Sequence, residues 1–235
     1  MRTVILHYHL FKNAGTSIDK ILRDNFPGAW ATREFSCKTE GNTSEVADWI
    51  TQTPDCVAFS SHTMLGPIPK IDGLQIVPLM LLRDPIERIQ SAYIFERDQR
   101  AETKGAKLAK AHDLQGYIDA RLAMPGDRQC KNFQTARLAS MMPGSDSELA
   151  RAYAAFEMMQ KAGVLGLVPA FNLAMAQLAE RVAPDLPDLI IPDIRLNRAA
   201  RPYKSLPSET LKQLIKENGD DLALLEHALR ALCAA

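Results

Sequence analysis

The chain has 235 residues, of which 46% are hydrophobic and 24% are charged. This is enough to bury a substantial core in one domain, with or without a helical annex. Basic and acidic residues balance at 28 each, so the formal net charge is zero. We expect no nucleic-acid partner, because such proteins carry a basic excess, and any anion site must be local. The four cysteines are Cys37, Cys56, Cys130 and Cys233. They contain no C-x-x-C pair, which argues against a zinc site or a dense disulfide framework.

No apolar run approaches the roughly 20 residues that cross a bilayer. The longest candidate, residues 74–82, is short and contains Gln75 and Pro78. The early run VILHYHL has no cleavage site after it and is better explained as a core strand than as a signal peptide. We therefore expect a cytoplasmic protein with no membrane span.

The first predicted elements are a strand over 4–10 and a helix that begins at the following loop. Ile18, Ile21 and Leu22 recur at helical spacing. Thr16 and Asp19 have the spacing of a capping box, which predicts that the helix starts there.

Further strands are predicted over 56–61 and 76–82, each ending in polar residues. Residues 83–98 read as a helix, with Asp84 as the cap, Pro85 at the first position and Glu87 completing the box. Alternation of apolar strands with amphipathic helices is typical of βαβ units, so we predict an α/β fold with a mostly parallel sheet.

The second half of the chain is predicted to be mainly helical and to belong to the same single domain, 1–235. Helices are expected over 113–124, 130–142, 147–162 and 170–182, with a short strand over 163–168. Residues 184–204 contain four prolines and predict an irregular connection. Two C-terminal helices should follow, with Gly219 between them.

The loop FKNAGTS, residues 11–17, has the composition of an anion cradle at a helix N-terminus. Such a terminus leaves backbone N–H groups unpaired and carries partial positive charge. Ala14 and Gly15 allow close approach, Thr16 and Ser17 add hydroxyl donors, and Lys12 adds a full charge. A plain strand-to-helix turn with an exposed lysine is the alternative.

A second group of polar residues is predicted at the same edge of the sheet. Arg83 ends the strand 76–82, and Ser91 lies about two helical turns further on. His62 ends the strand 56–61. Ligands of parallel sheets collect at the carboxyl ends of strands, where an arginine beside a hydroxyl suits a phosphate. An ion pair of Arg83 with Asp84 or Glu87 is the alternative for that residue.

Two of these segments resemble motifs of one enzyme family. HLFKNAGTSI (9–18) is similar to the loop H-I-P-K-T-[AG]-G-T-S-L, and RDPIERIQSAY (83–93) to R-[DN]-P-x-x-R-x-x-S-x-Y, of the sulfotransferases related to heparan sulfate 2-O-sulfotransferase. NFQTARLA (132–139), 166–180 and 196–228 are similar to later segments in the same order. Phe11 and Asn13 depart from the usual Pro and Thr, and Asn13 is expected to alter a phosphate contact.

The resemblance implies a P-loop-NTPase-like three-layer fold and a function. The donor would be 3′-phosphoadenosine 5′-phosphosulfate, with adenosine 3′,5′-bisphosphate as the product and no metal required. The loop residues Lys12, Asn13, Ala14, Gly15, Thr16 and Ser17 would bind its 5′ end, and Arg83 and Ser91 its 3′-phosphate. Arg198 and Arg201 of the basic loop would close over the nucleotide.

In the implied chemistry, Lys12 stabilises the leaving oxygen and His62 is the catalytic base. His7 and His9 share one face of the first strand and are assigned to core or supporting roles. The acceptor would be a hydroxyl of a carbohydrate, glycolipid or small metabolite.

Two other functions remain open from the residues. A nucleotide kinase or NTPase would place its lysine directly before Ser/Thr and a carboxylate at a strand end for Mg²⁺, whereas Arg83 stands there. A non-catalytic adenine-nucleotide-binding protein would keep the same residues without turnover.

Overall fold

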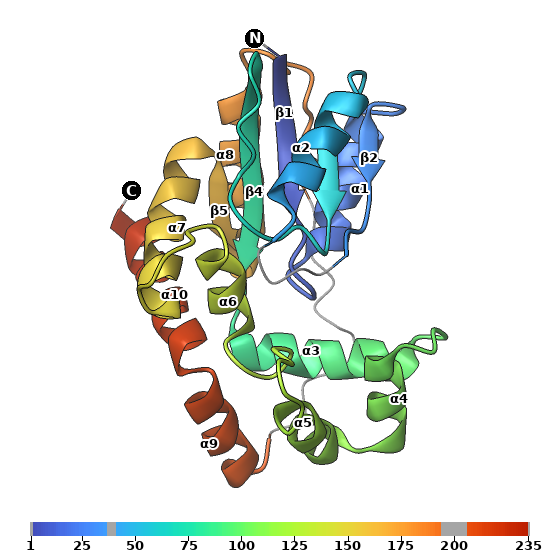
Figure 1. The fold of residues 1–235 in the computed structure, drawn as a ribbon, viewed down its shortest axis with the longest axis vertical. Coiled ribbons are helices and arrows are strands. Elements are labelled where there is room, and N and C mark those ends of the chain that lie inside the picture. Colours follow the sequence, from blue (N-terminus) through green and yellow to red (C-terminus); the bar gives the residue numbers. More distant parts are fainter. Residues whose placement is uncertain (1, 37–40, 194–205, 235) are drawn as a thin grey trace. The chain divides into compact units, whose positions relative to one another are not determined.

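The computed structural model describes residues 2–36, 41–193 and 206–234, and they group into two compact units (Figure 1). The first unit comprises Met1–Leu82 and Arg137–Leu196, and the second comprises Arg83–Ala136 and Asn197–Ala235. The predicted single domain 1–235 stays a prediction.

The first unit is built around one parallel sheet. Its elements are β1 (Arg2–Tyr8), α1 (Gly15–Asn25), β2 (Trp30–Thr32), α2 (Thr43–Gln52), β3 (Ala58–Ser61), β4 (Leu74–Leu82), α7 (Glu148–Ala162), β5 (Val164–Leu167), the 3₁₀ turn η1 (Val168–Ala170) and α8 (Phe171–Val182). The strand order is β2-β3-β1-β4-β5, and every neighbouring pair is parallel. This is the three-layer α/β, P-loop-like fold, as predicted.

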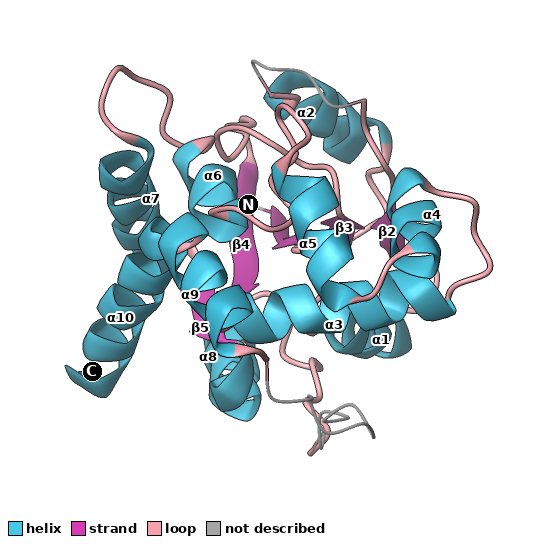
Figure 2. Ribbon diagram, turned by 90° about the horizontal axis from the view of Figure 1, so that it is seen from below, coloured by secondary structure: helices cyan, strands magenta, loops and turns pink. Residues whose placement is uncertain are grey.

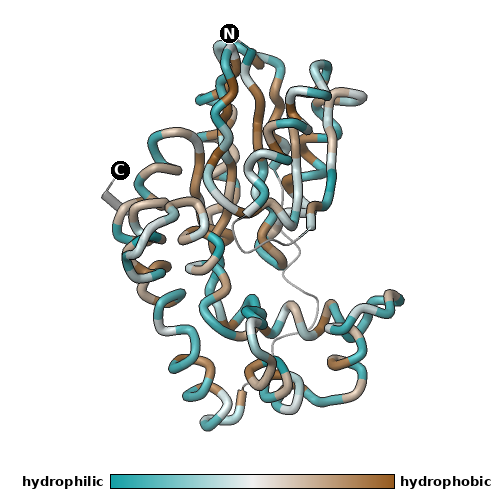
Figure 3. Tube along the Cα trace, viewed as in Figure 1, coloured by the Kyte–Doolittle hydropathy of each residue, from teal (hydrophilic) through white to brown (hydrophobic). Residues whose placement is uncertain are grey.

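Helices cover both faces of this sheet (Figure 2). One core joins Ile5 of β1 and alternate residues of β4 to α1 and α8, and it includes Ile18, Leu79 and Met175. On the opposite face Trp49 of α2 packs edge-on against Phe59 of β3, with ring centroids 4.9 Å apart. Figure 3 shows hydrophobic residues along much of β1 and β4, as expected for strands buried on both faces.

The second unit is helical. It contains α3 (Pro85–Asp98), α4 (Lys104–Ala111), α5 (Leu114–Leu122), α9 (Ser208–Glu217) and α10 (Gly219–Ala234), and α6 (Phe133–Ala139) carries the chain back into the first unit. Its core includes Ile89, Tyr93, Tyr117, Ile118 and Leu214.

Most predicted elements are confirmed, with shifted ends. The cap at Asp84 is confirmed, since its carboxylate accepts from the backbone N–H groups of Ile86 and Glu87, each at 2.9 Å. The helix predicted over 130–142 is shorter, and Gly219 is the first residue of α10 rather than a separator. Strand β2 and helices α2 and α4 were not predicted.

The predicted capping box at Thr16 and Asp19 is wrong. The N-cap of α1 is Ala14, which offers no side-chain hydrogen bond, and the helix starts at Gly15. Asp19 lies one turn inside the helix, where its carboxylate faces β1 and bonds to side chains there.

Candidate active site

Several polar residues follow the parallel strands directly, at one edge of the sheet of the first unit. The loop FKNAGTS follows β1, Glu34 comes shortly after β2, and His62 comes directly after β3. In the sheet, β2 and β3 lie on one side of β1, and β4 and β5 lie on the other. The direction in which strands are added thus reverses at β1, which is the topological switch point. Ligands of open α/β sheets bind at this place.

The loop after β1 has a constrained backbone. Lys12 and Ala14 have positive φ angles of 66° and 62°, a region that residues with a side chain rarely adopt. Backbone strain of this kind clusters at ligand-binding sites. Thr16 is exposed, while Lys12 and Ser17 are partly buried.

Asn13 ties the loop to the sheet. Its side chain is 2% exposed and donates a 2.7 Å hydrogen bond from Nδ2 to the carbonyl of Leu81 in β4. The backbone N–H of Asn13 donates to the carbonyl of Leu10 at 3.1 Å. Both of these contacts therefore hold the loop in place.

The position of Gly15 has no room for a side chain, because the ring of His9 lies too close. A Cβ at Gly15 would lie 2.0 Å from Cδ2 and 2.2 Å from Nε2 of His9. The imidazole of His9 thus lies directly against the first turn of α1.

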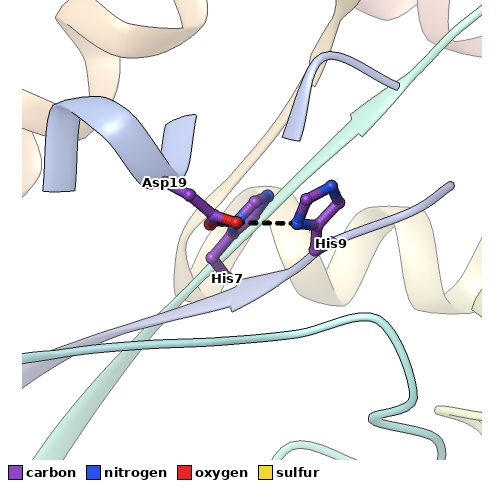
Figure 4. Close-up of side chains that lie close together, drawn as sticks. All are labelled: His7, His9 and Asp19. Atoms are coloured by element: carbon purple, nitrogen blue, oxygen red, sulfur yellow. Dashed lines mark hydrogen bonds and ion pairs between the residues drawn. The ribbon is translucent and has the colours of Figure 1, made fainter. Parts of the chain in front are cut away.

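Asp19 holds both histidines of the β1 segment (Figure 4). Its Oδ1 lies 2.8 Å from His7 Nδ1, and its Oδ2 lies 2.9 Å from His9 Nδ1. The hydroxyl of Ser60 in β3 donates to the same Oδ1 at 2.6 Å. His7, 1% exposed, and His9, 6% exposed, are therefore buried, and Nδ1 of each ring bonds to Asp19. Their supporting role stays a prediction.

These contacts set the protonation states. Burial by itself raises the pKa of Asp19, but the hydrogen bonds from His7 and His9 outweigh it and hold this pKa well below its usual range. Burial lowers the pKa of His9, opposed by its hydrogen bond to Asp19. An ionised Asp19 beside a neutral His9 is the state expected near neutral pH.

His62 is oriented by Glu34 and lies on His9. Its Nδ1 lies 2.8 Å from Glu34 Oε1, and its ring centroid is 3.7 Å from that of His9. The side chains of His62 and Glu34 are 46% and 50% exposed. Burial raises the pKa of Glu34, but hydrogen bonds from His62 and Thr63 lower it overall, so this carboxylate stays ionised. With Nδ1 bound to Glu34, Nε2 of His62 is the nitrogen that can act on a substrate.

The turn that carries His62 is also fixed from behind. Nη2 of Arg137 donates to the carbonyls of His62, at 2.6 Å, and Met64, at 2.8 Å. Arg137 belongs to the NFQTARLA segment, which gives that motif a definite structural role.

Arg83 and Ser91 belong to the second unit. The backbone N–H and carbonyl of Arg83 are both held by the side-chain amide of Gln134, each at 2.8 Å. Nη2 of the Arg83 guanidinium lies 3.4 Å from Oε2 of Glu87. This is the ion pair that the sequence offered as the alternative to a phosphate contact. Ser91 is partly buried on α3. A crevice shared by these residues and the loop stays a prediction.

Sequence reasoning missed two carboxylates of the site. Asp19 was interpreted as a capping residue, and Glu34 fell in a segment without a recognised motif. One signal in the sequence could have indicated that Asp19 lies near the sheet. Asp19 directly follows Ile18, and the helical spacing of Ile18 and Leu22 predicts that these two residues face the core. Arg198 and Arg201 lie outside the described residues.

The fold and this edge define the class of the protein: a P-loop-like α/β protein with a strained strand-to-helix loop and a paired histidine and carboxylate at the strand ends. No family model matches the chain. A protein of Archaeoglobus fulgidus, described as uncharacterized, is 35% identical over 226 residues, which cover 94% of this chain and 88% of that protein. The chain belongs to one family with this archaeal protein.

Among the described residues, no helix is long and apolar enough to cross a membrane.

Proposed function

We propose that this protein is a sulfotransferase that moves a sulfuryl group from 3′-phosphoadenosine 5′-phosphosulfate to a hydroxyl of a carbohydrate or small-molecule acceptor. One observation carries the proposal: His9 touches both Gly15 of the loop and the ring of His62, so an anion cradle and an oriented base adjoin each other. The resemblance of residues 9–18 and 83–93 to the sulfotransferase motifs supports the choice of donor.

The loop supplies what the donor end requires. The first turn of α1 has no side-chain cap, and the backbone N–H groups of Ser17 and Ile18 donate to the carbonyl of Ala14. The backbone N–H groups of Gly15 and Thr16 and the hydroxyls of Thr16 and Ser17 suit the 5′-phosphosulfate. Lys12, in the strained part of the loop, suits the oxygen that bridges phosphorus and sulfur. Negative charge grows on this oxygen during transfer, so a lysine there stabilises the transition state more than the ground state.

His62 supplies the base. Its Nε2 takes the proton of the acceptor hydroxyl while that oxygen forms a bond to sulfur. The bond from sulfur to the bridging oxygen breaks, and its electron pair leaves with adenosine 3′,5′-bisphosphate. Glu34, ionised and bonded to Nδ1, holds the ring and stabilises the imidazolium that forms.

In the second unit, Arg83 and Ser91 are the residues we assign to the 3′-phosphate. Gln134 fixes the backbone of Arg83 on both sides of its Cα. The guanidinium would have to exchange a contact of 3.4 Å to Glu87 for the phosphate. A doubly charged phosphate offers a stronger, bidentate partner than one exposed carboxylate.

Nucleotide binding separates this proposal from its rivals. Adenosine 3′,5′-bisphosphate should raise the melting temperature without added Mg²⁺ and by more than Mg-ATP does. A nucleotide at 100 times its dissociation constant stabilises by about 2.7 kcal/mol. Lys12→Ala should reduce this shift, whereas Lys70→Ala, an exposed lysine of the same unit, should leave it unchanged.

An equal or larger shift with Mg-ATP would favour the kinase or NTPase alternative. Transfer of labelled sulfate from the donor to pooled hydroxyl-bearing cell metabolites tests turnover. Nucleotide binding without any such transfer would leave the non-catalytic alternative and refute the proposed enzyme.

A further inference from the structure

His7, His9 and Asp19 bring three metal-binding atoms together in the first unit. His7 and His9 are two positions apart on an extended segment, so their side chains emerge on one face of the sheet. Their rings are nearly parallel, with centroids 5.1 Å apart. Asp19 reaches across from α1, and Figure 4 shows its carboxylate directed at both rings.

The spacing of these atoms fits a single ion. The two Nδ1 atoms and the Asp19 carboxylate all lie within 4.8 Å of one another, with nitrogen-to-oxygen distances of 2.8 and 2.9 Å. Two ligand atoms at about 2.0–2.2 Å from one tetrahedral metal ion are separated by roughly 3.3–3.6 Å, so each ring must move away from the carboxylate by roughly half an ångström. Only small side-chain shifts are needed to admit an ion.

The chemistry of the set selects the kind of ion. Imidazole nitrogens with one carboxylate suit borderline divalent transition metals such as Zn²⁺, whereas Mg²⁺ and Ca²⁺ prefer oxygen ligands. Metal ligation needs neutral imidazole and ionised carboxylate.

We propose that His7, His9 and Asp19 form a binding site for one divalent transition-metal ion of the Zn²⁺ class, which joins β1 to α1. Without an ion, each imidazole donates its Nδ1 proton to Asp19. When an ion binds, both Nδ1 atoms coordinate it and each ring carries its proton on Nε2. Ser60, which donates to Asp19 at 2.6 Å, orients the carboxylate from behind.

Access and position support a site that the solvent can load. The side chain of Asp19 is 19% exposed, while those of His7 and His9 are 2% and 8% exposed. An ion would therefore reach the three residues from the side of this partly exposed carboxylate. The test of this site does not need sulfuryl transfer, because none of the three residues is assigned to the donor or the acceptor.

Metal titration tests the site directly. Protein stripped with a chelator and then freed of it should bind one equivalent of Zn²⁺ in competition with a chromophoric chelator. Co²⁺ should give visible d–d absorption from nitrogen and oxygen ligands. Asp19→Asn and His7→Gln should each weaken Zn²⁺ binding by about 100-fold or more, since even the loss of an outer-shell partner costs 10–100-fold.

His112→Gln, which changes an exposed histidine of the second unit, is the matched control and should keep the affinity. Equal Zn²⁺ affinity in wild type, Asp19→Asn and His7→Gln would overturn the proposal. If the ligand variants fail to fold, wild-type protein decides: one equivalent of Co²⁺ with d–d absorption supports the site, and its absence at stoichiometric metal refutes it.

Discussion

The side chains of the first unit form a connected series at the strand ends. Asp19 holds His7 and His9, His9 lies between Gly15 and His62, and Glu34 orients His62. The two carboxylates bond to the three imidazole rings, and the ring of His9 packs against that of His62. The effects of changing them should therefore be coupled, since residues in one network do not act additively.

His62→Ala should keep stabilisation by adenosine 3′,5′-bisphosphate and lower the rate of sulfate transfer by about 10²–10⁴-fold, the usual contribution of a general base. Glu34→Gln should give a smaller loss, because the ring keeps a hydrogen-bond partner but loses the negative charge. The measurements are melting temperature with nucleotide and rate of labelled sulfate transfer.

His112→Ala serves as the control, since this exposed residue lies in the other unit and should transfer at the wild-type rate. If His62→Ala transfers normally, another group is the base.

At the scale of elements, the junction of β1 and α1 organises the site. β1 pairs with β3 and β4, and α1 packs its stripe of Ile18, Ile21 and Leu22 against the sheet. The loop between them is short and takes two positive φ angles, so it must turn sharply to bring α1 back over β1. Helix packing thus fixes where Asp19 meets the histidines.

Gly15→Ala should disturb this junction. Its new methyl group would lie 2.0 Å from Cδ2 of His9, so the ring or the first turn of α1 must move. We expect a loss of about 1–3 kcal/mol of unfolding free energy, the range for overpacked sites. Denaturant unfolding measures this change.

Gly144→Ala is the matched control, because a Cβ there meets nothing within 4 Å and the same unit contains it. Equal stability of the two variants would contradict the close packing of His9 on Gly15.

For the whole molecule, two buried thiols report on the two units separately. Cys56 lies in the first unit and is 6% exposed, and Cys130 lies in the second and is 1% exposed. Burial raises the pKa of the Cys130 thiol to about 12, and it also raises the pKa of Cys56. Both thiols should react slowly while their units are folded, because the thiolate is the nucleophile.

In a Cys37→Ser/Cys233→Ser background, alkylation at pH 8 should be much slower than in denaturant, and slowest at Cys130. A folded pKa above the unfolded value of about 8.5 means that the folded state binds the proton more tightly. This contribution to stability is therefore complete below pH 8.5 and is lost as pH rises toward 12. Mass-spectrometric labelling rates across pH check both points, and fast native labelling of Cys130 would contradict its burial.

Local signals in the sequence accounted for much of the fold. Asp84 and Pro85 start α3 as predicted, and four of the five strands were located, because caps and apolar runs depend on neighbours along the chain. The loop after β1 and His62 were also located. Strand β2, with only three residues, gave too weak a pattern.

The sequence by itself determined the α/β class, the helix stripe and the strand-end positions of FKNAGTS and His62. Tertiary structure alone decided their partners. Parallel pairing of β1 with β3 sets His7 opposite Ser60, and α1 brings Asp19 to both. Glu34 meets His62 because β2 and β3 are neighbours in the sheet. Such contacts arise from strand order and helix packing, and residue spacing along the chain predicts neither of them.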